Sequence, residues 1–287
     1  MNNGIVERQN EEKSICYLAA QRQLYNEAKR LNYIEIIFSV FLPLLFAILQ
    51  SIINDNIYLK TLLYVLPIVS MVVSLLVGSY IECKKKTAAE IQQHFDLYVY
   101  QMPWDNKLFG LQKNVTHIVA KEVTLLLRNS KEHKQFTNWY TTVAGTVELK
   151  KGILMCQKEN YYWDVGLRKR FQKLSIIIII VLIVIIFLLG IIKNETVMML
   201  LGRFSFITPM FQWLFKTIKQ LNKDIKNLEE LDNLINSSEP KSMDKLQEIQ
   251  NKIYIHRKSC YTIPNKFYNR YRNNDEDVAH RTALLDK

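Results

Sequence analysis

The amino-acid sequence predicts a mainly α-helical membrane protein, a four-helix transmembrane bundle with a helical cytoplasmic layer. Four stretches are nearly free of charge, whereas the remaining sequence is rich in Lys and Arg. Only 8 Gly and 6 Pro occur in 287 residues, and this scarcity disfavours a loop-rich β architecture. The mean hydropathy of -0.05 averages these two populations, so it hides the apolar segments.

Four segments have the length and composition of transmembrane helices. A bilayer core of about 30 Å needs about 20 apolar residues in a helix. The predicted spans are residues 34–53, 57–81, 174–192 and 196–215. The third is almost entirely Ile, Leu and Val, and a chain of this size has no interior wide enough to bury four such segments. The fourth is the weakest, because it contains Arg203.

The cations predict how these spans are oriented. They gather next to one end of every span: Lys29, Arg30, Lys84, Lys85, Lys86, Arg168, Lys169, Arg170, Lys173, Lys216 and Lys219. The two short connections at the other ends hold only Lys60 and Lys193. Because cytoplasmic loops are enriched in Lys and Arg, we expect a multi-pass protein with both termini in the cytoplasm.

This orientation divides the chain into five parts. They are a cytoplasmic N-terminal helix (1–32), a first transmembrane hairpin (33–82), a basic cytoplasmic segment (83–173), a second hairpin (174–215) and a helical cytoplasmic C-terminal region (216–287). The basic segment has 16 Lys and Arg against 8 Asp and Glu, a net charge of +8. Two explanations stay open: attraction to anionic lipid together with the positive-inside bias, or binding of an anionic ligand such as a nucleotide.

The cytoplasmic parts read as helices. Apolar residues recur at steps of three and four within 11–31, and the segments 84–100, 113–131 and 157–173 are also predicted to be helical. The fourth span is expected to continue as a helix whose apolar seam consists of Ile218, Leu221, Ile225, Leu228, Leu231 and Ile235. This seam could pack within the chain or form a coiled coil between subunits of a homo-oligomer. A last helix is predicted over 243–257.

Signatures of catalysis are missing from the sequence. It contains no Gly-rich phosphate loop, no H-E-x-x-H motif and no G-x-S-x-G motif. The four Cys and five His are scattered, which favours reduced cytoplasmic thiols and no metal site. We therefore predict a protein that is not an enzyme and has no cofactor.

Polar residues within the spans carry more information. An Arg near the middle of a bilayer costs at least a few kcal/mol unless it meets a partner or water. Arg203 is therefore expected to have a structural partner inside the bundle or to line a pore. Ser70, Ser74 and Gly78 recur at four-residue spacing in the second span, a pattern that suits close contact between helices.

A ligand site is predicted from aromatic residues and cations of the basic segment. Trp104 and Trp163 could stack on a base while Arg168 or Arg170 binds phosphate. The alternative is structural, with the Trp residues anchoring a core or lying at the membrane interface. Three acids, Asp96, Asp105 and Asp164, are expected to pair with Arg or to cap helices.

Several blocks, taken in order, resemble the SMODS-associating four-TM effector family. They are Leu18-Ala19-Ala20-Gln21-Arg22 with Leu24-Tyr25 and Ala28-Lys29, Phe95-Asp96 with Met102-Pro103-Trp104-Asp105, Trp139-Tyr140, Cys156-Gln157 with Asn160, Trp163-Asp164 and Leu167-Arg168, and Ile253-Tyr254 with Arg257, Ile263-Pro264 and Tyr268. None of these blocks is a catalytic signature, and the resemblance covers nearly the whole length.

The resemblance implies an effector of bacterial anti-phage systems of the CBASS type, which signal through cyclic oligonucleotides. Such an effector lies in the bacterial inner membrane beside a nucleotidyltransferase that makes the cyclic nucleotide. It is expected to permeabilise the membrane on activation, as an oligomeric pore, and to cause abortive infection. Its partners would be lipid, further copies of itself and the cyclic nucleotide, without DNA or RNA. Two alternatives are a non-conducting membrane-anchored tethering module and, with weaker support, a small-molecule transporter.

Overall fold

The structure is a computed structural model. It describes residues 2–50, 57–129, 136–192, 194, 196–198, 201, 204, 207–236, 242–271, 278 and 281. Arg203 lies outside these residues, and so does the side chain of Trp163. The chain is mainly helical, as predicted, and the described residues contain no strand.

The helices follow one another with short connections. In chain order they are α1 (Ile5–Asn10), α2 (Glu12–Ile36), the π-helical turn η1 (Ile37–Phe41), α3 (Leu42–Gln50), α4 (Ile57–Tyr100), α5 (Asn106–Phe109), α6 (Thr116–Asn129), the 3-10 turn η3 (Thr142–Thr146), α7 (Leu149–Ile192), α9 (Thr208–Asn236) and α10 (Met243–Ser259). A further short helix covers residues 265–271.

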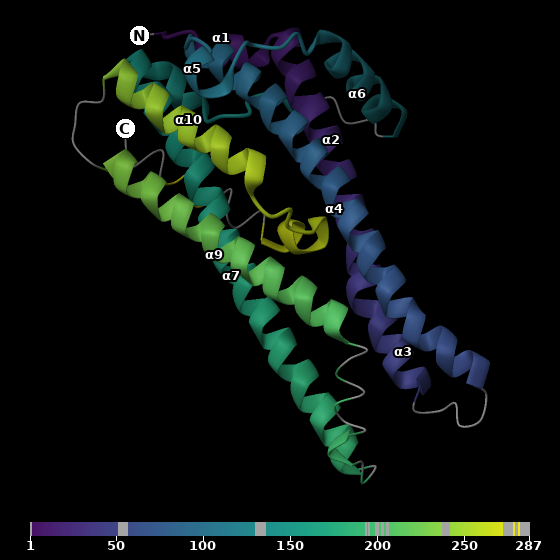
Figure 1. Cartoon of the computed structure of the whole chain (residues 1–287). Coiled ribbons are helices and arrows are strands. Elements are labelled where there is room, and N and C mark those ends of the chain that lie inside the picture. Colours follow the sequence, from purple (N-terminus) through teal and green to yellow (C-terminus); the bar gives the residue numbers. More distant parts are fainter. Residues whose placement is uncertain are drawn as a thin grey trace.

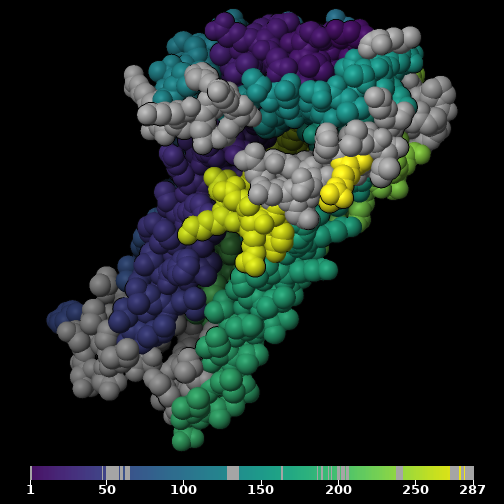
Figure 2. Space-filling view, turned by 180° about the vertical axis from the view of Figure 1, so that it is seen from behind, coloured from purple at the N-terminus to yellow at the C-terminus, as the bar shows by residue number. Residues whose placement is uncertain are grey.

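The molecule has a head and two legs (Figure 1). The head contains α1, α5, α6 and α10 together with the adjoining parts of α2, α4, α7 and α9. The first leg consists of η1, α3 and the beginning of α4, and the second consists of the end of α7 beside the start of α9. Seen from behind, residues 265–271 (yellow) lie between the legs, directly below the head (Figure 2).

Single helices run from the head into the legs. The 44 residues of α4 and the 44 residues of α7 each form one uninterrupted helix. The predicted helices 84–100 and 157–173 are therefore confirmed, and each is continuous with the helix that contains the second or third predicted span. In the same way α2 continues through η1 into α3, so the predicted N-terminal helix and first span form one helical path. Because these helices run without a break from the head into the legs, a displacement in the head can be transmitted along them to both legs.

The hydrophobic core lies in the head. Its largest fully buried side chains include Leu18, Phe95, Tyr100, Tyr140 and Ile153. The predicted seam of α9 contributes to this core, since Leu221, Ile225, Leu228, Leu231 and Ile235 are all buried. The seam packs against α7 and α10 of the same chain. The sequence left two roles open for this seam, packing within the chain or a coiled coil between subunits. The structure shows packing within the chain.

The legs, in contrast, present apolar side chains to their surroundings. Two described helices are long and apolar enough to cross a membrane, over Val65–Tyr100 and Leu149–Ile192. On them Ile68, Leu75, Ile177 and Phe187 are 54–61% exposed. Water would solvate such surfaces poorly, whereas lipid accommodates them. The predicted boundaries of all four spans remain predictions, because helix length and composition do not mark where a bilayer begins, and the first and fourth spans lie partly outside the described residues.

Candidate functional site

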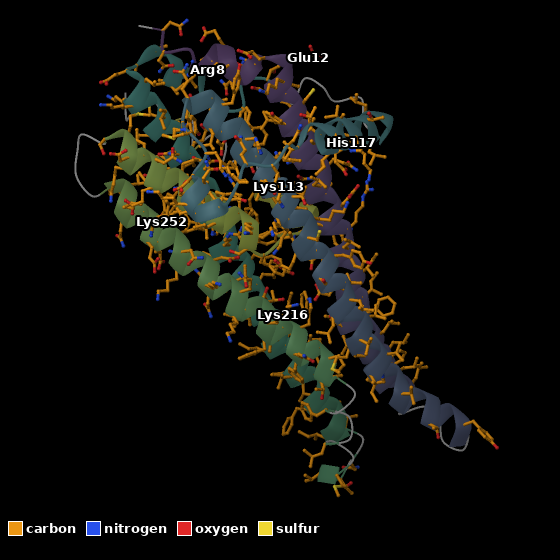
Figure 3. The ribbon with its side chains drawn as sticks, turned by 45° about the horizontal axis from the view of Figure 1, so that its top comes forward. Arg8, Glu12, Lys113, His117, Lys216 and Lys252 are labelled. Carbon is orange, nitrogen blue, oxygen red and sulfur yellow. The ribbon has the colours of Figure 1, made fainter. Side chains whose placement is uncertain are left out.

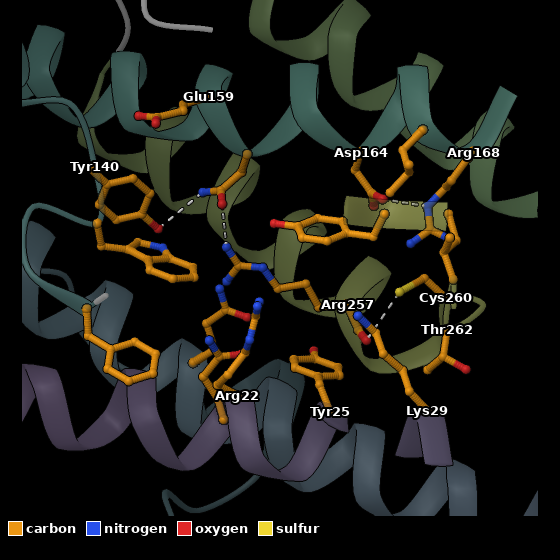
Figure 4. Close-up of a pocket in the computed structure, with 18 of the residues that line it drawn as sticks. Arg22, Tyr25, Lys29, Tyr140, Glu159, Asp164, Arg168, Arg257, Cys260 and Thr262 are labelled. Carbon is orange, nitrogen blue, oxygen red and sulfur yellow. Dashed lines mark hydrogen bonds and ion pairs between the residues drawn. The ribbon is translucent and has the colours of Figure 1, made fainter. Parts of the chain in front are cut away.

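A cavity of about 600 Å³ lies within the head. Small-molecule sites usually measure about 300–1,000 Å³, so a ligand of nucleotide size is compatible with this volume. Figure 4 shows side chains from α2 (purple) entering from one side and side chains from α7 (teal) from the other. Residues 136–141, the loop after α10 and Tyr268 complete the lining.

The α2 wall supplies positive charge. Arg22, Tyr25 and Lys29 recur at steps of three and four, so they share one face of the helix and all line the cavity. The Lys29 ammonium donates to Asn265 Oδ1 at 2.6 Å and lies 5.2 Å from the centre of the Tyr268 ring. The Arg22 guanidinium lies 5.9 Å from the same ring. Within the described part of the chain no carboxylate forms an ion pair with Arg22 or Lys29, so their charge is available to an anion.

Arg22 also affects the ionisation of Lys29. Burial of the Lys29 ammonium, with a further contribution from the positive charge of Arg22, lowers its pKa to about 8. An anion bound between them would offset both effects. This wall therefore favours a negatively charged ligand.

The two arginines on the opposite side are already neutralised. Arg168 is 4% exposed, with its Nη1 2.7 Å from Asp224 Oδ2 and its Nε 2.9 Å from Asp164 Oδ1. Arg257 pairs with Asp96, which is fully buried. Buried charges need such partners, and these ion pairs hold α7 to α9 and α10 to α4. The predictions that Asp96 and Asp164 pair with Arg are confirmed.

Asp164 remains ionised for the same reason. Burial alone would raise its pKa, but the charge of Arg168 and a hydrogen bond with His256 outweigh burial and hold the pKa below its ordinary value. His256 Nε2 lies 2.6 Å from Asp164 Oδ2. On the α7 side of the cavity Arg168 is thus already paired with carboxylates, unlike the cations on the α2 side.

An aromatic shelf forms the third wall. Segment 136–141 brings Phe136, Trp139 and Tyr140 to the cavity. Helix α1 holds this segment: Gln9 accepts a hydrogen bond from Tyr140 N at 2.8 Å and donates to Tyr140 O at 3.2 Å. The Tyr140 hydroxyl donates to Asp96 Oδ1 at 2.6 Å. The shelf is consequently fixed in place before any ligand binds.

The floor of the cavity is the loop 259–262, which begins at the last residue of α10. This loop is hydrogen-bonded to all four long helices. Each helix contributes a side chain that donates to a backbone carbonyl of the loop: Asn32 Nδ2 to Thr262 O (3.1 Å), Lys85 Nζ to Cys260 O (2.9 Å), Arg168 Nη1 to Tyr261 O (3.0 Å) and Gln220 Nε2 to Ser259 O (3.1 Å). A displacement of this loop therefore acts on α2, α4, α7 and α9 together.

The residues predicted as ligand-binding do not form one group. Arg168 lines the cavity. Arg170 points elsewhere, 4.7 Å from the centre of the Tyr271 ring. Trp104 lines a second cavity of about 600 Å³, between α1, α2 and α4, and its indole nitrogen donates to Gly110 O at 2.9 Å. The side chain of Trp163 and Arg203 lie outside the described residues, so their predicted roles stay predictions.

Sequence reasoning missed the α2 cations as binding residues. Tyr25 lies in the apolar repeat predicted within 11–31, Lys29 was interpreted only as a cation that orients the first predicted span, and Arg22 only as part of a family block. Their spacing of seven residues on one helical face was the available signal. The blocks behind the family resemblance give a second signal, because Arg22, Tyr140, Asn160 and Arg257, from four of the five blocks, all meet at this cavity.

Comparison with known proteins agrees with that resemblance. The chain matches the SMODS-associating 4TM effector domain over residues 3–284. It is similar to a protein of Bacillus cereus (strain VD146) named as a probable CBASS effector molecule, with 23% identity over 241 residues, 80% of this chain and 78% of that protein. No solved structure matches the chain. Because the domain match covers nearly every residue, the chain belongs to the family of SMODS-associating 4TM effectors.

Proposed function

We propose that this protein is a membrane effector of a CBASS-type anti-phage system, activated by a cyclic oligonucleotide that binds the cavity of the head. The observation that carries the proposal is the pair Arg22 and Lys29, which has no carboxylate partner among the described residues and lies beside an aromatic shelf. Phosphodiester groups are anionic and bases stack on aromatic rings, so the cavity offers both contacts that a nucleotide requires. The name of the Bacillus cereus relative supports the same role.

The proposed binding mode places phosphate on α2 and a base on the shelf. Arg22 and Lys29 would donate to phosphate oxygens, displacing Asn265 and Tyr268 from the Lys29 ammonium. Trp139, on the wall formed by residues 136–141, would stack on a base. Arg168 and Arg257 would support the cavity instead of binding phosphate, because each is already paired.

The proposed response is permeabilisation of the bacterial inner membrane by an oligomer. We infer that four spans cross the bilayer, formed by the path through α2, η1 and α3, by α4, by α7 and by the segment leading into α9, with both termini in the cytoplasm. A ligand that moves the loop 259–262 would act on all four helices at once. Four spans can line a pore only when subunits assemble, so activation would include oligomerisation.

Dye leakage from liposomes tests this function. The full-length protein would be reconstituted into carboxyfluorescein-loaded vesicles and exposed to cyclic di-AMP, cyclic di-GMP, cyclic GMP–AMP and cyclic tri-AMP. We expect leakage with at least one of them and none with linear AMP. Absence of both leakage and binding for the whole panel would contradict direct sensing. Tight binding without leakage would instead favour the non-conducting tethering module.

The pKa of Lys29 predicts how binding depends on pH. The ammonium contacts phosphate only when it is protonated, and its pKa in the free protein is about 8. Affinity should be constant below that value and fall above it, by about tenfold between pH 7 and pH 9. Isothermal titration calorimetry across this range measures the effect. In Lys29→Arg the charge persists at pH 9, so the loss should disappear; an equal loss in both proteins would exclude Lys29 as its source.

A further inference from the structure

A cluster of oxygen atoms lies where the first leg meets α9. Glu35, near the end of α2, is 5% exposed, and Ser39 in the π turn and Ser70 on α4 are each 2% exposed. The Ser74 hydroxyl donates to Glu35 Oε1 at 3.3 Å, and the Ser39 hydroxyl donates to Ser74 Oγ at 3.0 Å. A buried carboxylate is costly unless it is hydrogen-bonded and paired with a positive charge, so the partners of Glu35 are informative.

The backbone contributes to this cluster through the π turn. Residues 37–41 depart from α-helical geometry, and the Ser70 hydroxyl donates to the carbonyl oxygen of Phe38 within that turn. Such π turns inside helices occur frequently at functional sites. The predicted contact stripe of Ser70, Ser74 and Gly78 is confirmed here, because its two serines bond across to the first span.

A cation already lies at the edge of the cluster. Lys216, in the first third of α9 near the second leg (Figure 3), places its ammonium 3.5 Å from Glu35 Oε1. That separation is longer than the ~2.7–2.9 Å of a good ammonium–carboxylate hydrogen bond, and the Lys216 side chain is 66% exposed. Gly78 lies directly beside the pair, since a Cβ there would be in van der Waals contact with both, 3.6 Å from Lys216 Nζ and 3.9 Å from Glu35 Oε1. The ammonium is therefore loosely held.

We propose that Glu35, Ser39 and Ser74 form a binding site for a monovalent cation, Na⁺ or K⁺, and that Lys216 competes for it as a tethered ammonium. All three side chains offer oxygen, which is the ligand atom that hard cations prefer. When Lys216 turns away into solvent, the buried carboxylate needs another positive charge, and the hydroxyls of Ser39 and Ser74 beside it offer a small cation further oxygen ligands. The site requires neither a nucleotide nor leakage, so it goes beyond the function proposed above.

Removing the competitor tests the site. Purified full-length Lys216→Ala in detergent should bind ²²Na⁺ more tightly than wild type in a scintillation proximity assay. Its midpoint of thermal unfolding should rise by about 3–5 °C when Na⁺ or K⁺ reaches ten times its dissociation constant. N-methyl-D-glucamine at equal ionic strength should cause no rise, because it is too large to enter.

Two further variants decide the interpretation. Lys219→Ala removes an exposed lysine one turn along α9 and should behave as wild type. Lys216→Ala/Glu35→Gln keeps the shape of the cluster without its charge and should lose both ²²Na⁺ binding and the thermal shift. If Lys216→Ala binds no more ²²Na⁺ than wild type, the cluster is an ordinary ion pair and the proposal is overturned. Binding that survives Glu35→Gln would overturn it too, because the cation would then lie elsewhere.

Discussion

Replacing Asp96 with alanine is expected to lower the stability of the protein by about 3–5 kcal/mol. Asp96 is completely buried and joins three elements of the head: it accepts hydrogen bonds from Tyr140 Oη at 2.6 Å and Gln250 Nε2 at 2.8 Å, and it pairs with Arg257. Without the carboxylate, the charge of Arg257 stays buried and uncompensated. Circular dichroism of the full-length protein in detergent would show this as a markedly lower midpoint of thermal unfolding.

A second variant separates the lost charge balance from lost packing. Asp96→Leu/Arg257→Met replaces both charged groups by apolar side chains of similar size, and buried ion pairs often tolerate such replacement. We expect the double variant to regain much of the stability that Asp96→Ala loses. If it is no more stable than Asp96→Ala, the uncompensated charge of Arg257 is not the cause, and Tyr140 and Gln250 are the partners that matter.

Arg22→Ala is expected to weaken binding of the activating cyclic nucleotide by about 10- to 150-fold. A hydrogen bond to a charged group contributes about 1.5–3 kcal/mol, which corresponds to that range. No carboxylate of the described residues pairs with Arg22, so its removal leaves no buried charge unpaired and the fold should be retained. Titration calorimetry with the nucleotide that causes leakage measures the affinity, and the leakage curve should move to higher concentration by a similar factor.

Arg30→Ala is the matched control for this experiment. Arg30 lies on the same helix, carries the same charge and is exposed, but it does not line the cavity. Its removal should change the affinity by less than about twofold, because exposed charges contribute little through water. Equal weakening by both substitutions would mean that α2 attracts the nucleotide only through its overall charge, and the cavity would lose its assignment.

The helices of this protein were predictable because burial repeats locally along them. The seam of α9 illustrates this: Leu221, Leu228 and Leu231 face α7 and α10 at the spacing that the sequence indicates. The extension of the second span to Tyr100 was predictable for the same reason. In each case the pattern lies within one helix.

The candidate site was less predictable, because it depends on which charges find partners across the fold. Arg168 belongs to a cationic run before the third span and resembles a phosphate ligand in sequence. Packing then brings it to Asp224, 56 residues away, and neutralises it. Arg22 and Lys29 remain without such carboxylate partners among the described residues, and their spacing on one helical face does not by itself show that they stay unpaired while Arg168 does not. The role of Gln9 in holding the shelf likewise depends on a contact between segments 131 residues apart.

The parts of the cavity are synthesised at different times relative to the apolar segments. Three of its walls come from residues up to Arg168, but Arg257, the loop 259–262 and Tyr268 follow all the apolar segments in the chain. A ribosome therefore delivers every apolar segment before the cavity can close. If the cavity is the nucleotide site proposed above, a cell already containing the nucleotide could not trigger the growing chain until the C-terminal region has folded against the rest.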